Sequence, residues 1–586
     1  MRRISLLIFA ALMLMASTGC WASDTVKRAA QKTVVAYVTS WTDIMPDPTL
    51  MTHINYAFGH VNDTFDGVRI DNEQRLRDIV ALRKQCPQLK VMLSIGGWGS
   101  GRFSEMAGSE KSRLSFTRDC RRVVDEYGLD GIDIDWEYPT QSSAGISSSP
   151  DDTRNFTLLM RDIRKAIGKR KLLTMASVGS AEFVDFRGCI DYLDFVNVMS
   201  YDMGNPPYHH SALYDSSVSA PMTTSKAVER HLAAGVPKSK LVVGMPFYGR
   251  GGDKDNILHD FVRTRYTGDE YHECWNDSAQ VPFLADKDGK LVLGYENKRS
   301  LAVKCQYVID NNLRGGMYWD YESDNCQHDA ARTLHLSLMR HGKGVEAPNR
   351  VLVLAERGGG HEAFTAAALE WLDSVKDSLN MELTIVSDAR TLAEGDIDRH
   401  NLVLQLNYPP YEWSDVSRRE FERYIDESRG AYIGLHHATL LGDFDGYPMW
   451  QWFSDFMGGI MFQTYVPQLA DGTVQVEQTG HPVMEGLPKT FVIPNDEWYT
   501  YNSNPRRNVH VLAHVDEASY VDKDSAPQGG PEAFHPIPTM GDHPVIWVNT
   551  SKHARNVYFQ FGHDKQLLQT PEFLRMMTNA LKWTLR

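Results

Sequence analysis

The chain has 586 residues, of which 42% are hydrophobic and 10% aromatic, and its formal net charge is −14. This length is too great for one ordinary hydrophobic core, so at least two domains are expected, and the apolar content excludes a disordered chain. The acidic balance, without a basic stripe interleaved with aromatic residues, argues against nucleic acid as a partner.

The first twenty residues have the pattern of an export signal. Arg2 and Arg3 precede the apolar run 6–16, and three small residues precede Cys20. Small residues directly before a cysteine resemble a bacterial lipoprotein box, so residues 1–20 are predicted to be a signal peptide of lipoprotein type. Cys20 is then expected to carry the lipid and to be the only contact of the protein with a membrane. The exported protein would be anchored in the cell envelope and would face the periplasm or the cell surface. The alternative is an ordinary signal peptide with an incidental cysteine.

Six further cysteines show no CxxC or metal-ligand spacing. An even number in an exported protein permits disulfides, in fifteen connectivities, and buried free thiols are equally compatible with the sequence. These residues are Cys86, Cys120, Cys189, Cys274, Cys305 and Cys326.

After a linker at 21–32, short apolar runs alternate with amphipathic helical patterns over residues 33–342. The clearest helical face spans Phe156 to Ile167, with Asp151 and Asp152 ahead of it and Gly168 behind. Eight strands separated by helices predict a (β/α)8 barrel, in which the active site lies at the carboxyl ends of the strands. The predicted strands are 33–39, 53–59, 90–95, 129–136, 171–178, 194–200, 241–247 and 315–319.

A polar bridge at 343–349 separates the barrel from a second α/β unit at 350–586. Alternation of strands and helices restarts at Arg350, and the chain closes with a helix that has Thr570 as N-cap and Pro571 at its first position. The pattern predicts a doubly wound α/β domain. Its predicted strands are 351–354, 401–406, 431–436, 544–548 and 556–561.

The segment DGIDIDWEYP at 130–139 carries the chemistry of the barrel. Alternate residues of a strand share a face, so Asp133, Asp135 and Glu137 all point into the barrel. Burying three acids without basic partners is costly, and crowding pushes their pKa values apart. Glu137, at the open end, is therefore expected to remain protonated and to donate to a leaving oxygen.

This segment resembles the DxxDxDxE signature of glycoside hydrolase family 18, in its chitinase branch. Further motifs of that family recur at other predicted strand ends. They are SIGGW at 94–98, MSYD at 199–202, GMPFYGR at 244–250 and GGMYW at 315–319.

The resemblance implies substrate-assisted, retaining hydrolysis of β-1,4 bonds between N-acetylglucosamine units, as in chitin or its oligosaccharides. Glu137 would be the acid and base, Asp135 would orient the substrate acetamido group, and Asp133 would share a proton with Asp135. Tyr201 would bind the acetamido oxygen. The implied substrate-binding residues are Tyr37, Ser94, Trp98, Met199, Asp202, Tyr248 and Trp319.

The α+β insertion common before the last strand of that family is shortened here to about residues 251–300, which predicts a shallower, more open cleft. Soluble oligosaccharides or glycan chains are therefore favoured over crystalline chitin. One alternative is an endo-β-N-acetylglucosaminidase acting on N-glycans. Another is a surface glycan-binding lectin, although such lectins typically lose the glutamate that stands here as Glu137.

Residues 350–586 resemble the ThuA-like (trehalose-utilisation) family, whose fold is flavodoxin-like and related to class I glutamine amidotransferases. The resemblance is carried by GLHHA at 434–438, HPVMEGL at 481–487, DEWY at 496–499, and PVIW at 544–547 followed by Gly562 and His563. It implies a carbohydrate-related role of undefined chemistry. An amidotransferase needs a nucleophilic cysteine, and this half of the chain has none.

Four histidines and one glutamate of this half fall near predicted strand ends, where an open α/β sheet binds its ligands. They could form a metal site or an acid/base site on a sugar, or be hydrogen-bonded loop residues. No HxH or HExxH spacing supports a metal, so neither a metal nor a cofactor is expected. The residues are His361, His436, His437, Glu497 and His563.

Overall fold

The computed structural model of the protein describes residues 32–251, 254–258, 270–444, 446–466, 469–520 and 539–586. The predicted signal peptide, its Cys20 and all of the predicted linker except Lys32 lie outside the described residues. Among the helices described, none is both long and apolar enough to cross a membrane.

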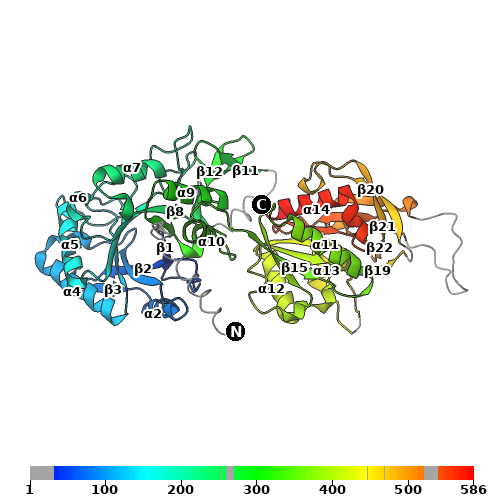
Figure 1. The fold of residues 1–586 in the computed structure, drawn as a ribbon, viewed down its shortest axis with the longest axis horizontal. Helices are drawn as coiled ribbons and strands as arrows, with labels where there is room; N and C mark the ends of the chain where they lie inside the picture. Colours follow the sequence, from blue (N-terminus) through cyan, green and yellow to red (C-terminus); the bar gives the residue numbers. More distant parts are fainter. Residues whose placement is uncertain (1–31, 252–253, 259–269, 445, 467–468, 521–538) are drawn as a thin grey trace, which may run out of the picture. The chain divides into compact units, whose positions relative to one another are not determined.

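The first domain is a closed barrel of parallel strands, as predicted from the sequence (Figure 1). The strands follow one another around the barrel in the order β1-β14-β8-β7-β6-β5-β4-β2, and β2 pairs again with β1. A short strand, β3 (Val68–Ile70), extends β2 as an antiparallel hairpin. The barrel strands are β1 (Thr33–Thr39), β2 (His53–Val61), β4 (Lys90–Gly96), β5 (Gly131–Asp135), β6 (Leu172–Val178), β7 (Phe195–Met199), β8 (Leu241–Pro246) and β14 (Gly315–Trp319).

Helices cover the outside of the barrel, as Figure 1 shows for α2 and α4 to α7. The helix predicted from its apolar face is α5, and its residues Phe156, Leu159, Met160, Ile163 and Ile167 are all buried. The helices of this domain are α2 (Glu73–Ala81), α3 (Phe103–Gly108), α4 (Glu110–Glu126), α5 (Asp152–Ile167), α6 (Phe186–Cys189), α7 (Thr224–Ala234), α9 (Lys298–Asp310) and α10 (Asp329–His335).

The apolar and the acidic residues of the β5 segment lie on opposite faces of the strand. Ile132, Ile134 and Trp136 belong to the apolar layer between strands and helices. The Trp136 ring stacks on Phe103 with centroids 5.3 Å apart and also contacts Phe156. This outward packing forces the alternate residues of the segment, which are the acids, towards the barrel interior.

The insertion between β8 and α9 is small, and its described residues form an antiparallel sheet. The strand order is β10-β9-β13-β12-β11. The sequence therefore located the insertion correctly. The strands are β9 (Tyr248–Gly251), β10 (Lys254–Leu258), β11 (Tyr271–Asn276), β12 (Val281–Asp286) and β13 (Leu291–Gly294).

The second domain is built on one mixed sheet with the order β16-β15-β17-β18-β25-β24-β23-β20-β21. Its first five strands are parallel in a 2-1-3-4-5 order, which is the flavodoxin-like arrangement. The remaining four strands are antiparallel, and the sequence predicted only β24 among them. The strands are β15 (Asn349–Ala355), β16 (Met381–Val386), β17 (Leu402–Leu406), β18 (Ala431–Leu435), β20 (Ala470–Val476), β21 (Thr490–Asp496), β23 (His510–Asp516), β24 (Pro544–Val548) and β25 (Asn556–Phe559), with β19 (Phe462–Tyr465) and β22 (Tyr499–Tyr501) in a separate pair.

Helices cover both faces of this sheet. Alternate residues of β15 divide between two apolar layers, with Val351 and Val353 in one layer and Leu352 and Leu354 in the other. The first layer holds residues of α11 and α14, and the second holds residues of α12 and α13. These helices are α11 (Glu362–Val375), α12 (Asp415–Asp426), α13 (Gln451–Phe456) and α14 (Pro571–Thr584).

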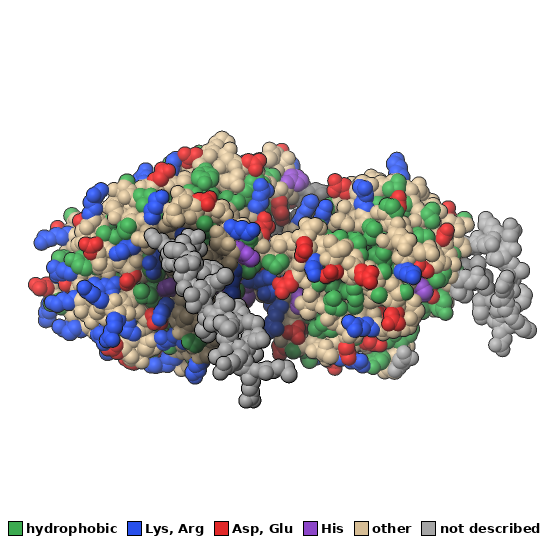
Figure 2. Space-filling model, viewed as in Figure 1, with side chains coloured by type: hydrophobic (Ala, Val, Ile, Leu, Met, Phe, Trp, Pro, Cys, Tyr) green, Lys and Arg blue, Asp and Glu red, His purple; other side chains and the backbone are tan. Residues whose placement is uncertain are grey.

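Charge is dispersed over the molecular surface seen in Figure 2, where Lys and Arg side chains alternate with Asp and Glu on both domains. The net charge of −14 is therefore not gathered in one patch of this face.

Four of the six cysteines are buried thiols of the barrel and form no disulfide among the described residues. These are Cys86, Cys120, Cys189 and Cys305, so of the two possibilities left open by the sequence the structure shows thiols at these positions.

Candidate active site

Asp133 is the deepest acid of the β5 ladder and has a full set of donors. Its carboxylate accepts hydrogen bonds from the hydroxyls of Tyr37 at 2.9 Å, Ser94 at 2.8 Å and Thr174 at 2.5 Å, and from the Asn197 amide at 3.3 Å. Burial raises the pKa of Asp133, and these hydrogen bonds partly oppose that shift. The residue is completely buried and supports the site from beneath.

Asp135 lies one step nearer the opening and lines the cavity. Its Oδ1 atom is buried and has no hydrogen-bond partner among the residues the structure describes. Burial raises its pKa well above the usual value, and the charges of Glu137 and Asp133 add to the shift. A buried carboxylate oxygen without a donor is unfavourable, so this atom is suited to accept a hydrogen bond from a bound ligand.

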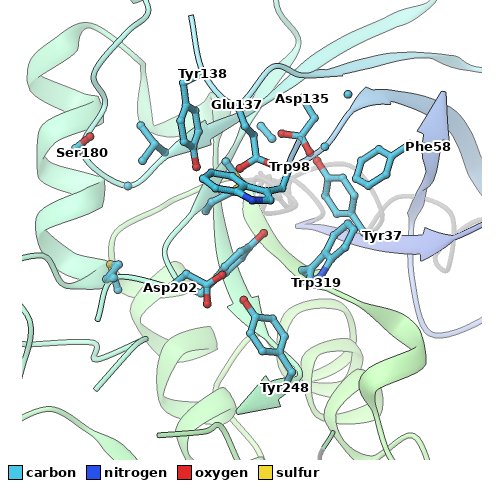
Figure 3. Close-up of a pocket in the computed structure, with 18 of the residues that line it drawn as sticks. Tyr37, Phe58, Trp98, Asp135, Glu137, Tyr138, Ser180, Asp202, Tyr248 and Trp319 are labelled. Atoms are coloured by element: carbon cyan, nitrogen blue, oxygen red, sulfur yellow. The ribbon is translucent and has the colours of Figure 1, made fainter. Parts of the chain in front are cut away.

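Glu137 follows β5 and points into the same cavity (Figure 3). Burial raises its pKa to about 7, and the negative charge of Asp202 contributes to the shift. A carboxyl group with this pKa is half protonated near neutral pH, which is the condition for a general acid that later acts as a base.

Aromatic side chains line a cavity of about 870 Å³ around the two upper acids. Trp319 stacks on Phe58 with centroids 5.5 Å apart and planes 20° from parallel, and it contacts Tyr37 at 5.7 Å. Trp98 lies across the opening in Figure 3 and is 65% exposed. Flat rings on the wall and at the rim of a cleft suit the apolar faces of sugar rings.

The opposite wall carries residues that follow β7 and β8 along the chain. Arg250 donates two hydrogen bonds to Asp202, at 2.7 and 2.6 Å. The Tyr201 hydroxyl lies 3.9 Å from Sδ of Met317, which is a weak acceptor. Tyr201 therefore retains the capacity to donate a strong hydrogen bond to a ligand in the cavity.

The second domain has its own cluster of polar side chains. The ring of His361 lies 3.9 Å from that of His437, 4.5 Å from that of His563 and 5.0 Å from that of His436, centroid to centroid. Glu497 joins the cluster, with Oε2 at 3.3 Å from Nε2 of His436. The five residues singled out in this half of the sequence therefore share one site.

Comparison with known proteins agrees with both sets of motifs. Residues 33–324 match the glycosyl hydrolases family 18. The first domain of the chain therefore belongs to glycoside hydrolase family 18. Residues 350–584 match the trehalose utilisation (ThuA) family, so a ThuA domain follows the family 18 domain.

The relatives are distant, and their similarity is confined to part of the chain. Chitinase A1 of Niallia circulans is 30% identical over 342 residues, which cover 50% of this chain and 48% of that protein, so the chain spans about half its length. Chitotriosidase-1 of Mus musculus is 28% identical, with coverages of 54% and 81%. The solved structure of a family 18 N-acetylglucosaminidase from Paenibacillus barengoltzii is 31% identical, with coverages of 53% and 99% and a TM-score of 0.48.

The structure brings nine of the eleven predicted family 18 site residues to the cavity wall. The other two, Asp133 and Ser94, are completely buried beneath it. Ser94 was predicted to bind substrate, but its hydroxyl donates to Asp133 instead. The nine at the wall are Tyr37, Trp98, Asp135, Glu137, Met199, Tyr201, Asp202, Tyr248 and Trp319.

Several residues of the cavity wall were not predicted. Arg250 is the last residue of the GMPFYGR motif, and a search of the family motifs for a basic partner of Asp202 would have found it. Phe58 lies near the carboxyl end of the predicted strand 53–59, so an inspection of strand ends would have found it. The remaining polar or aromatic residues missed at the wall are Trp41, His60, Asp71, Tyr138 and Ser180.

The ThuA cluster also contains residues that the sequence did not single out. Glu356 directly follows β15, and its carboxylate contacts His437 at 3.0 Å and His361 at 3.5 Å. His436 was predicted to end a strand, but β18 stops at Leu435 and His436 begins a 3-10 turn with a φ of 41°. This left-handed conformation is rare for a residue with a side chain, and such outliers gather at functional sites.

Proposed function

We propose that the family 18 domain hydrolyses β-1,4 bonds between N-acetylglucosamine units of chitin or chitooligosaccharides, with Glu137 as the acid and base. One observation carries the proposal: a carboxyl group with a pKa of about 7 shares a cavity with the unpartnered Oδ1 of Asp135 and the Trp319 ring. The first can move a proton, the second can orient an amide, and the third can seat a sugar ring.

In the first step Glu137 donates its proton to the glycosidic oxygen, and the bond from that oxygen to the anomeric carbon breaks. The carbonyl oxygen of the substrate's 2-acetamido group attacks the anomeric carbon and forms an oxazolinium ion. Oδ1 of Asp135 accepts the acetamido N–H, and the Tyr201 hydroxyl donates to the acetamido oxygen. Glu137, now ionised, then removes a proton from water that attacks the anomeric carbon, which restores the acetamido group with net retention.

The charges around Asp202 support this division of roles. Asp202 is held by Arg250, and the hydrogen bonds and charges of His210 and Arg250 lower its pKa, so it stays ionised. An ionised neighbour disfavours a second charge on Glu137 and helps to keep it protonated until it donates. Asp202 therefore raises the pKa of Glu137 and is not itself the proton donor.

The small insertion supports short or soluble substrates. The antiparallel sheet β9–β13 is the part of this insertion that the structure describes, and Trp98 and Trp41 stand 65% and 63% exposed at the cavity. An open cleft of this kind suits a glycan chain that enters from solvent. The chitobiose core of an N-glycan offers the same bond, so an endo-β-N-acetylglucosaminidase is the second candidate function.

Mass-spectrometric analysis of products tests the proposal. Chitin oligosaccharides and, separately, an N-glycosylated protein are incubated with the wild type and with Glu137→Gln. Short N-acetylglucosamine oligomers from the wild type alone support the chitinase, with a loss of about 10²–10⁴-fold or more in Glu137→Gln because proton donation is removed. Release of N-glycans alone supports the second candidate. Retained glycan binding without cleavage of either substrate makes the barrel a lectin and overturns the proposal.

The N-terminal sequence supports export and lipid anchoring at Cys20 in the cell envelope. Expression in a bacterium followed by membrane fractionation tests this localisation. The wild type is expected in the membrane fraction with a lipid mass on its first mature residue. Cys20→Ser is expected to lose both, and a wild type without the added mass contradicts lipidation.

A further inference from the structure

We propose that the ThuA domain binds one divalent transition-metal ion through His361, His436, His437, Glu497 and His563. The sequence predicted no metal, because these residues show no ligand spacing along the chain. Their arrangement in space changes that expectation. The inference concerns the second domain alone and does not depend on the function proposed for the barrel.

The fold places the donors at one edge of the sheet. His361 follows β15, His436 follows β18 and His563 follows β25, and these strands belong to the parallel 2-1-3-4-5 part of the sheet. The carboxyl ends of parallel strands meet at one edge, which is where open α/β sheets bind their ligands. Glu497 reaches the same edge from the end of β21.

The donors form two overlapping groups of three that share His361. One ligand atom each from His361, His436 and His437 lies within 4.8 Å of the others, and the same holds for His361, Glu497 and His563. Nε2 of His436 and Oε2 of Glu497 are 3.3 Å apart. Two donors that each lie about 2.0–2.2 Å from a metal are roughly 3.0–3.5 Å apart, so this pair already has the spacing of neighbouring ligands.

The histidine rings are held from behind by acceptors. His436 directs Nδ1 to the carbonyl oxygen of Gln560 at 2.8 Å. His437 directs Nδ1 to Oε1 of Glu356 at 3.2 Å, and Nδ1 of His361 lies 3.5 Å from Oε2 of the same carboxylate. When Nδ1 donates its proton to such an acceptor, Nε2 carries the lone pair, which is the usual arrangement behind a metal-binding histidine.

Two buried ring nitrogens make no hydrogen bond within the described part of the chain, namely Nε2 of His361 and Nε2 of His436. The latter faces the Glu497 carboxylate at 3.3 Å without forming a hydrogen bond to it. The two residues are only 7% and 0% exposed. Buried polar atoms are almost always satisfied, so two adjacent exceptions aimed into one cluster indicate a missing ligand.

The backbone around the cluster is fixed by further polar contacts. The buried carboxylate of Asp496 accepts hydrogen bonds from the backbone N–H groups of Glu497 at 2.8 Å, Gly562 at 3.2 Å and His563 at 3.4 Å. One side chain thereby ties together two donor-bearing loops. A Cβ atom at Gly562 would lie 2.9 Å from that of His436, so close packing requires glycine there. Such a preorganised donor set is expected of a binding site.

The donor chemistry selects the class of ion. Imidazole nitrogen with one carboxylate suits Zn²⁺ and the other first-row divalent ions such as Mn²⁺, whereas Ca²⁺ and Mg²⁺ prefer oxygen ligands. His437, Glu497 and His563 are only partly buried. The outer side of the ion is therefore accessible to water or to an oxygen of a substrate.

Metal analysis of the full-length protein tests the site. The chain is stripped with a chelator, dialysed, and titrated with Zn²⁺ or Mn²⁺ alone, with stoichiometry read by elemental mass spectrometry and affinity by calorimetry. One ion per chain is expected, together with a higher melting temperature, since a ligand of the folded state stabilises it. His361→Gln and Glu497→Gln are expected to weaken binding by more than the roughly 10–100-fold that loss of a group behind a ligand causes.

Two further variants separate ligation from folding. Glu356→Gln removes no proposed ligand but alters the acceptor behind two rings, and it is expected to weaken binding by about 10–100-fold. His510→Gln removes an exposed histidine of β23 in the same domain and is expected to change nothing. Far-UV circular dichroism reports folding in every variant. No ion in the wild type, or equal affinity in wild type and in folded His361→Gln and Glu497→Gln, overturns the proposal.

Discussion

Arg250 donates a hydrogen bond to each carboxylate oxygen of Asp202, from Nε at 2.7 Å and from Nη2 at 2.6 Å. This two-point contact keeps Asp202 negatively charged beside Glu137, whose own pKa is raised to about 7 by burial first and by Asp202 second. The pair therefore links Arg250, a residue of β9, to the protonation of the proposed acid.

The pH profile of Asp202→Asn tests this link. Loss of protonated Glu137 is expected to produce an alkaline limb in kcat/KM near pH 7 in the wild type. A negative neighbour raises the pKa of a carboxyl group, so removing it lowers that pKa. The alkaline limb of Asp202→Asn should therefore move to lower pH, measured as kcat/KM on a chitin oligosaccharide over a pH series.

Asp71→Asn is a matched control for that experiment. Asp71 also lines the cavity but is not among the groups that shift the pKa of Glu137. Its removal is expected to leave the limb in place, whatever its effect on the rate. An alkaline limb that stays fixed or rises in Asp202→Asn contradicts the proposed influence on the acid.

Substrates without a 2-acetamido group should not be cleaved. The proposed nucleophile is the acetamido oxygen of the substrate, and Asp135 has an open oxygen to orient that group. Cello-oligosaccharides of matched length are expected to give background rates, measured by reducing-end release beside chitooligosaccharides. Efficient hydrolysis of the cello-oligosaccharides would rule out substrate assistance.

Ser94→Ala should affect turnover more than substrate binding. Ser94 is completely buried and donates to Asp133 at 2.8 Å, so it touches the acid ladder and not the cavity. Losing one hydrogen bond to a charged group is expected to lower kcat by about tenfold, or roughly 1.4 kcal/mol, with KM nearly unchanged. Steady-state kinetics distinguishes this supporting role of Ser94 from a substrate-binding role. In a substrate-binding role, KM would rise and kcat would stay unchanged.

Trp136→Ala should destabilise the barrel without a direct effect on the site. Trp136 is 3% exposed, stacks on Phe103 and contacts Phe156 in the apolar layer outside the barrel strands. Truncating a buried tryptophan costs about 3–5 kcal/mol, measured by denaturant unfolding.

Trp98→Ala provides the contrast, because Trp98 is 65% exposed at the cavity rim. Its stability is expected to change by no more than about 0.5 kcal/mol, while KM for oligosaccharides rises. Equal destabilisation by the two variants would contradict the assignment of inner and outer faces.

The local periodicity of the sequence determined most of the barrel. Residues 33–39 and 315–319 were predicted with the bounds that the structure shows, because a short apolar run between helical patterns has few other conformations. The alternation along β5 also determined which residues face inward, since the side-chain period of a strand is two. Strands β20, β21 and β23 were missed, since their polar residues carry no comparable signal.

Only the tertiary structure decided which distant residues meet. Ser94 sits beneath the cavity because β4 and β5 pair in a register that sets it beside Asp133. The ThuA cluster joins residues from His361 to His563 because the 2-1-3-4-5 strand order brings the ends of β15, β18 and β25 to one edge. Periodicity in a sequence reports how each strand faces its own layer, whereas strand order and register depend on the packing of the whole sheet.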